Sequence, residues 1–165
     1  MATGDLYINP GTTISFKSSG GEATFTPTSL ASDAGRQSAF YNIGTGARPQ
    51  MFEYMARTKV ATAGVVGEIV EMRLCLAGAS AANPENDVSG DAGSFAEAKL
   101  QALKTILLPI FCHDTSTGVE FVSRGKILIA AEQVAINWWN RFTNALSSTA
   151  TDHEFTLKPI PFNEQ

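Results

Sequence analysis

The stretch QVAINWWNRFTNALSSTATDHEFTLKPIPF, residues 133–162, decides the fold class. Two runs rich in β-branched and aromatic residues, 134–139 (VAINWW) and 154–161 (EFTLKPIP), flank a loop of small polar residues. Such runs, bounded by turn-forming residues, are typical of β-strands. The stretch therefore predicts two extended segments and a chain built mainly from strands.

Two longer segments upstream show the same period of two. Residues 51–60 (MFEYMARTKV) place apolar side chains on one face and Glu53, Arg57 and Lys59 on the other, and residues 68–77 (EIVEMRLCLA) alternate in the same way. Alternation of this kind predicts strands with one buried and one solvated face. Because only a short, glycine-containing connection separates them, we expect the two strands to pair with each other in an antiparallel sheet.

Shorter segments complete the pattern. Residues 1–30 suggest an N-terminal arm or hairpin, with 12–16 and 22–26 paired around Gly20-Gly21. Residues 95–105 have helical spacing and predict a short helix, while Pro109 favours an edge position for its segment. Further strands are expected at 35–40, 119–123 and 126–130, and a long loop at 78–95.

These segments amount to about eight to ten strands and one short helix, without the alternation of strands and long helices typical of α/β proteins. We therefore expect residues 1–165 to form a single all-β domain, a two-sheet β-sandwich with a jelly-roll-like arrangement.

The composition of the chain argues against some classes of function. Charged residues make up 17% of the chain, and its formal net charge is −4, against roughly 25% charged residues in a typical soluble domain. Nucleic-acid binding is not expected, since it requires clustered basic residues. The longest apolar run, 106–112, is too short to span a bilayer, and no signal peptide is visible.

Cys75 and Cys112 lie in apolar runs and are expected to be buried free thiols in a protein made in a reducing cytoplasm. Their spacing does not settle whether they pair.

No pattern of residues points to catalysis, a cofactor or a metal. His113 and His153 are the two histidines, and each has Cys or acidic neighbours. A jelly-roll metalloenzyme of the cupin kind needs two closely spaced histidines on one strand, and the chain has no His-x-His pair. There is also no Gly-x-Ser-x-Gly elbow. We therefore do not expect the protein to be an enzyme. We expect the histidines to lie beside turns and to be hydrogen-bonded, with Thr151 and Asp152 as the partners of His153.

Trp138 and Trp139 are the most informative aromatic residues. Adjacent residues of a strand point to opposite faces, so one indole is expected in the core and the other on the outside. The outer indole either is partly covered by the protein's own chain, lies in an interface, or forms a platform for sugar stacking. We take Trp138, Trp139, Tyr7 and Phe162 as candidate interface residues.

Four segments together resemble a known group of proteins. They are SDAGR at 32–36, ARTK at 56–59, WWN at 138–140 and LSSTATDHEFTLKPIP at 146–161. In this combination the chain resembles the decoration or cement proteins on the heads of tailed bacteriophages, and the last thirty residues carry the resemblance most specifically.

The resemblance implies a jelly-roll protein, often trimeric, that binds the outer surface of the head and stabilises the lattice of the major capsid protein. The virion would be its location, the major capsid protein and further copies of itself its partners, and no nucleic acid or membrane would be bound. Two alternatives remain, namely a glycan-binding, host-attachment or other head or tail component of the virion, and a degenerate cupin-like enzyme.

Overall fold

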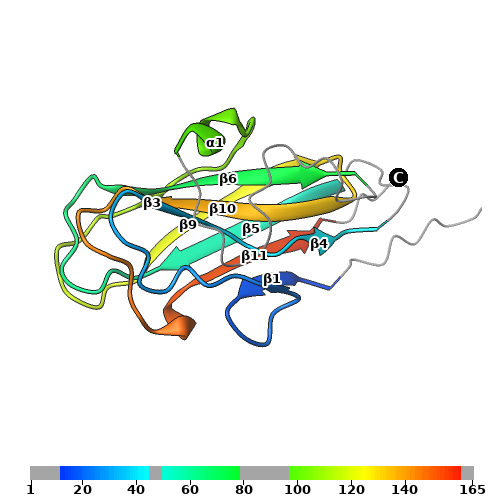
Figure 1. Cartoon of the computed structure of the whole chain (residues 1–165). Coiled ribbons are helices and arrows are strands. Elements are labelled where there is room, and N and C mark those ends of the chain that lie inside the picture. Colours follow the sequence, from blue (N-terminus) through cyan, green and yellow to red (C-terminus); the bar gives the residue numbers. More distant parts are fainter. Residues whose placement is uncertain (1–11, 45–49, 79–96, 161–165) are drawn as a thin grey trace, which may run out of the picture.

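Two β-sheets packed face to face form the body of the protein (Figure 1). The computed structural model describes residues 12–44, 50–78 and 97–160. Within these ranges the chain has eleven strands, one α-helix and one turn of 3-10 helix. The predicted two-sheet β-sandwich with one short helix is confirmed.

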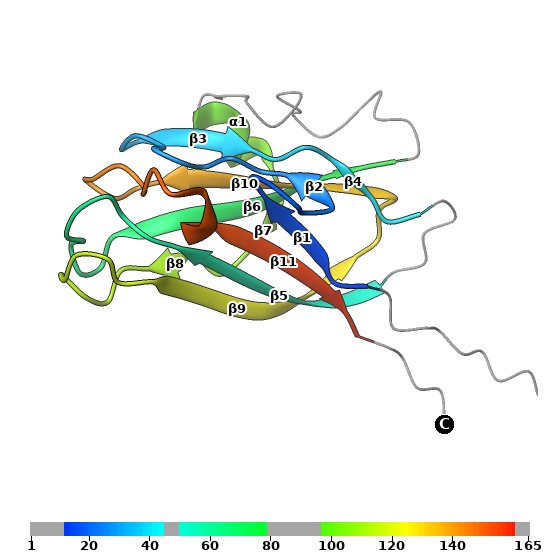
Figure 2. The ribbon, with the colours of Figure 1, turned by 90° about the horizontal axis from the view of Figure 1, so that it is seen from below.

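Figure 2 shows the strands of the first sheet side by side. In order across this sheet they are β2 (Ala23–Thr24), β1 (Ile14–Lys17), β11 (Glu154–Pro159), β5 (Gln50–Thr58) and β9 (Phe121–Ile129). The second sheet has the order β3 (Ala34–Gln37), β10 (Gln133–Asn140), β6 (Ile69–Ala77) and β7 (Thr105–Ile106), with β4 (Tyr41–Asn42) also paired to β10 and β8 (Ile110–Phe111) to β6.

The strand pairing is nested along the chain. The first strand, β1, pairs with the last, β11; β3 and β4 pair with β10; β5 pairs with β9; and β6 pairs with β7 and β8. All of these pairs are antiparallel, as in one long hairpin, and the β11–β5 and β10–β6 pairs roll that hairpin into two layers. A rolled hairpin of this kind is the jelly-roll arrangement.

This topology corrects the predicted pairing of residues 51–60 with 68–77. The corresponding strands, β5 and β6, lie in opposite sheets, because the chain crosses between layers in the connection that joins them. β5 is bounded instead by β9 and β11, and β6 by β10 and the β7–β8 segment. Rolling the hairpin separates the two strands although they are neighbours in sequence.

Two further predictions were wrong in detail. The 12–16 and 22–26 segments do not form an antiparallel hairpin, since β1 and β2 pair in parallel and the main partner of β1 is β11. The segments 119–123 and 126–130 belong to one continuous strand, β9. Position 125 of this strand is a glycine because a Cβ atom there would lie 2.7 Å from the Tyr54 ring and hydroxyl.

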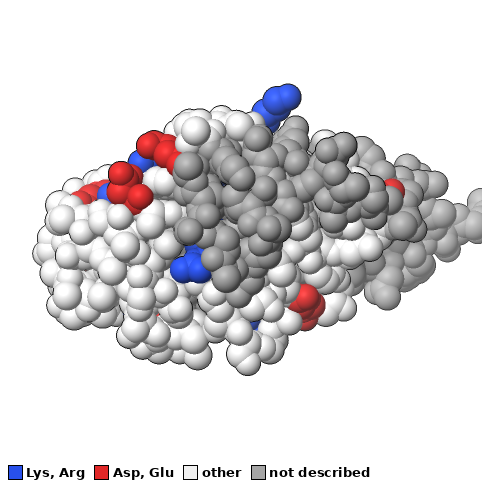
Figure 3. All heavy atoms as spheres, in the orientation of Figure 1, with Lys and Arg blue, Asp and Glu red and all other residues white. Residues whose placement is uncertain are grey.

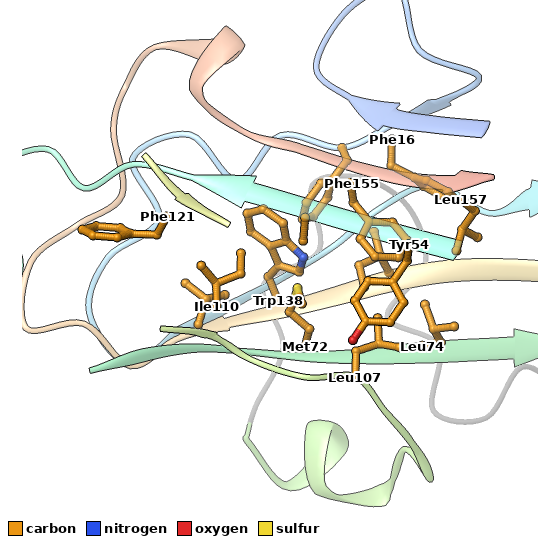
Figure 4. Close-up of a cluster of buried hydrophobic side chains, with 14 of the residues drawn as sticks. Phe16, Tyr54, Met72, Leu74, Leu107, Ile110, Phe121, Trp138, Phe155 and Leu157 are labelled. Carbon is orange, nitrogen blue, oxygen red and sulfur yellow. The ribbon is translucent and has the colours of Figure 1, made fainter. Parts of the chain in front are cut away.

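The core between the sheets is rich in aromatic side chains. Phe16, Phe155, Tyr54, Phe121 and Trp138 point into it from both layers (Figure 4). Their rings make edge-to-face and stacked contacts, such as Phe16 with Phe155 at 5.6 Å between centroids. Every fully buried phenyl group contributes roughly 2–3 kcal/mol of transfer free energy, so this interior is the main source of stability.

Helix α1 (Glu97–Ala102) confirms the short helix predicted at 95–105 and covers the outer face of the second sheet. Leu103, which follows the helix, packs against Cys75 and Ala135, the outward-facing residues of β6 and β10. The predicted solvated face of 68–77 is therefore wrong for this strand. Cys75 and Cys112 are free and buried, as expected. The predicted loop at 78–95 falls almost wholly outside the described residues.

Candidate interaction surface

The Trp138-Trp139 pair does not form an exposed interface. Trp138 is fully buried between the sheets, and Trp139 faces the other side of β10 with 5% of its surface exposed. The interface prediction is therefore wrong for these two side chains, which the protein covers with its own chain. Tyr7 and Phe162, the other candidate interface residues, lie outside the described residues.

Trp139 is held by a polar clamp beneath α1. Its indole Nε1 donates a hydrogen bond of 2.9 Å to Asp33 Oδ1, and the Arg141 guanidinium lies 5.1 Å from the ring centroid. Arg141 also pairs with Asp33 at 2.7 Å and with Glu97 of α1. The indole hydrogen bond and the Arg141 charge hold the pKa of Asp33 below its usual value. These contacts fasten the helix to the second sheet.

An arginine with little exposed surface makes a second attachment of the helix. Arg73 of β6 donates to the carbonyl oxygen of Leu103 at 2.8 Å and to the side-chain oxygen of Gln101 at 3.1 Å. A carboxylate oxygen of Glu71 lies 2.7 Å from the Arg73 guanidinium and balances its charge. The part of this outer face around Cys75, Ala135 and Trp139 is thus covered by the protein itself, so a partner surface is sought elsewhere on the sandwich.

One long side of the sandwich does expose apolar side chains. Ile106, Leu108 and Phe111 are 62%, 60% and 55% exposed, whereas Leu107, Ile110 and Cys112 are buried. Pro109 separates β7 from β8 and shifts the alternation by one residue, so three large side chains of a single apolar run face outward.

The strand register separates this exposed run from the exposed apolar residues of β9. Although β8 lies against β9, the exposed Val122 and Leu128 of β9 lie opposite Arg57 and Met51, on the outer face of the first sheet. We call Ile106, Leu108 and Phe111 the apolar strip. Exposed apolar side chains that gather on one side of a soluble protein often mark an interaction site.

Hydrogen bonds from the first sheet fix the backbone of the strip. The amide of Leu108 donates to the Tyr54 hydroxyl at 3.0 Å, and the Ser123 hydroxyl donates to the Leu108 carbonyl oxygen at 2.9 Å. Because Tyr54 reaches Leu108 beneath Gly125, the strip is tied to β5 and β9 as well as to β6. It is a preformed surface.

In the view of Figure 3 the described surface is mostly uncharged, and the acidic and basic side chains gather at a few points. This distribution agrees with the 17% of charged residues in the whole chain.

Hydrogen bonds hold the imidazole of His153 in the protein interior. His153 is buried; its Nδ1 lies 2.8 Å from Thr58 Oγ1 and its Nε2 lies 2.8 Å from the Ser147 carbonyl oxygen. Since a carbonyl only accepts, Nε2 carries the proton and Nδ1 accepts from Thr58 in the neutral ring. Burial lowers the pKa of His153, which favours this neutral form. The expected hydrogen bonding is confirmed, but the expected partners, Thr151 and Asp152, were wrong.

Within the ranges 12–44, 50–78 and 97–160, no three His, Cys, Asp or Glu side chains come together as a metal-binding group. Among the helices of these ranges, none has the length and apolar character needed to cross a bilayer.

Comparison with known proteins adds no relationship to these observations. No protein-family model matches the chain, and no curated protein matches it significantly.

Proposed function

We propose that this protein is a virion structural protein, a decoration protein that binds the outer surface of a tailed-bacteriophage head and stabilises the lattice of the major capsid protein. The observation that carries the proposal is a preformed apolar strip along one side of a jelly roll. Jelly rolls are used by viral capsid and lectin domains and by cupins. Among these roles, the resemblance of residues 146–161 to head proteins favours the capsid role.

The apolar strip fits a contact between copies of the protein. The segment 105–112 contains no charged residue, and an uncharged apolar contact is typical of permanent assemblies of one chain. An oligomer of identical subunits, with a trimer favoured, would bury the strip.

The charges on β9 argue against a two-fold contact between the β9 strands of two copies. A two-fold axis through Gly125 would bring Arg124 of one copy beside Lys126 of the other. Like charges at facing strand positions are destabilising. A head-to-tail arrangement around a three-fold axis avoids this repulsion.

The mechanism is stabilisation by binding. A protein that binds only the expanded lattice lowers the free energy of that lattice by RT ln(1 + [L]/Kd) at each site. Repetition over a symmetric shell turns modest individual contacts into resistance of the whole particle to disruption.

The glycan-binding alternative relied on an exposed indole of the Trp138-Trp139 pair. Both side chains are buried, so we do not extend the proposal to sugar binding.

Light scattering and sedimentation with expanded heads test the proposal. Wild type is expected to have three times the 17.6 kDa mass of the chain and to sediment with the heads. The variant Leu108→Ser is expected to lose the trimer, since it puts a polar group in the centre of the strip. Val66→Ser, an equally exposed position outside the strip, is the control and should keep the trimer. A monomeric wild type that leaves the heads unbound would overturn the proposal.

A further inference from the structure

The outer face of the first sheet is a second surface with a distinct character. Outward-facing side chains of β5, β9 and β11 include Glu53, Arg124, Lys126 and Lys158, all of them exposed. In the strand register Glu53 lies between Lys126 on one side and Lys158 on the other. We call these four residues the basic patch.

The basic patch has a surplus of positive charge that the described protein leaves unbalanced. Three cations surround one carboxylate, and neither Arg124, Lys126 nor Lys158 makes an ion pair within the described part of the chain. Arg57 on the same face is different, because Glu154 and Glu120 both lie 3.0 Å from its guanidinium. The patch is positive although the chain as a whole carries a net charge of −4.

Apolar side chains accompany these cations. Met51 and Leu128 face each other at one end of the sheet, and Met55 lies opposite Arg124. All three point outward. Protein–protein interfaces combine an apolar centre with a polar rim, and Met and Arg are enriched in them.

Nucleic acid fits this surface less well than an acidic protein does. The Glu53 carboxylate lies in the middle of the patch and would repel phosphates, and three cations are few for binding driven by counterion release. A protein segment places its carboxylates singly, so it can meet the cations and avoid Glu53.

We propose that the basic patch binds an acidic, partly apolar segment of the protein that forms the head lattice. This inference rests on the proposed function and adds the chemistry of the partner. Under it, the apolar strip joins copies to one another and the basic patch joins the oligomer to the shell.

A pair of charge reversals tests the inference. Lys126→Glu lies within the patch, and Lys104→Glu, at an exposed position between α1 and β7, makes the same change of net charge elsewhere. Binding of wild type and both variants is measured to expanded heads and, at low salt, to poly-L-glutamate and a short single-stranded DNA. We expect Lys126→Glu to weaken binding to heads and to poly-L-glutamate by about tenfold, and Lys104→Glu to change it less than about twofold. Added salt should reduce the difference between the variants.

The outcomes separate this inference from the proposed function. If wild type binds heads and both variants bind them equally well, the function stands and the inference is overturned. If wild type does not bind heads but Lys126→Glu selectively loses poly-L-glutamate, the function is overturned and the acidic specificity of the patch is supported. Tighter binding to DNA than to poly-L-glutamate overturns the inference in favour of nucleic acid.

Discussion

The hydroxyl of Tyr54 connects the core to the apolar strip, and its removal is the sharpest test of how that strip is held. Tyr54→Phe deletes the oxygen that accepts the Leu108 amide at 3.0 Å and keeps the ring. The stacking of this ring with Phe155, at 6.0 Å between centroids, is preserved. The substitution therefore isolates one hydrogen bond.

The expected loss of stability follows from the position of that bond. Tyr54 is buried and the bond is partly buried, so the Leu108 amide loses its partner where water only partly replaces it. We expect a loss of about 1–2 kcal/mol in the free energy of unfolding. For a chain of this length that corresponds to a fall in Tm of about 3–6 °C.

Urea unfolding gives the free energy, and amide hydrogen exchange gives the local effect. In Tyr54→Phe the Leu108 amide should exchange faster, since its native hydrogen bond is gone. Tyr41→Phe is the matched control, because the Tyr41 hydroxyl makes no hydrogen bond within the described residues. Equal stability of the two variants, with unchanged exchange at Leu108, would refute this view of the strip.

Three further predictions concern the core, the helix attachment and pH. Gly125→Ala should destabilise the fold by about 1–3 kcal/mol in urea unfolding, because the new methyl group meets the Tyr54 ring; wild-type stability would contradict this. Trp139→Phe should lower stability by about 1–3 kcal/mol and speed amide exchange in α1, since Asp33 loses its indole donor; unchanged exchange would argue against the clamp. The lowered pKa of His153 means that the unfolded chain binds the proton more readily, so its contribution to stability is full above pH 6.5 and declines as the pH falls towards the folded-state pKa, by at most about 1.4 kcal/mol per pH unit. His153→Gln should flatten this part of the pH profile, and an unchanged slope in urea unfolding would contradict the assignment.

The sequence predicted the fold class because its strong signals are local. Alternation in residues 51–60 and in the last thirty residues identifies strands without any knowledge of their partners. Partner choice is different, since it depends on how the whole hairpin rolls. The pairing of β5 with β9 and β11, and not with β6, has no local signal.

The choice of Trp138 and Trp139 as interface residues failed for a related reason. Trp138-Trp139 has an aromatic composition typical of interfaces, but α1 and the Arg141 clamp cover the outer indole, and those contacts come from distant parts of the chain. Residues 106–112 carried a usable signal. The break at Pro109 in an uncharged edge segment implies that large side chains on both sides of it face outward.

Electron microscopy of virus particles with and without this protein tests the proposed role most directly. Particles that lack the protein should lose regularly repeated density on the outer head lattice, and adding the purified protein should restore it at the same positions. Identical head surfaces in both preparations, or restored density at the tail instead of the head, would contradict a function in decorating the capsid.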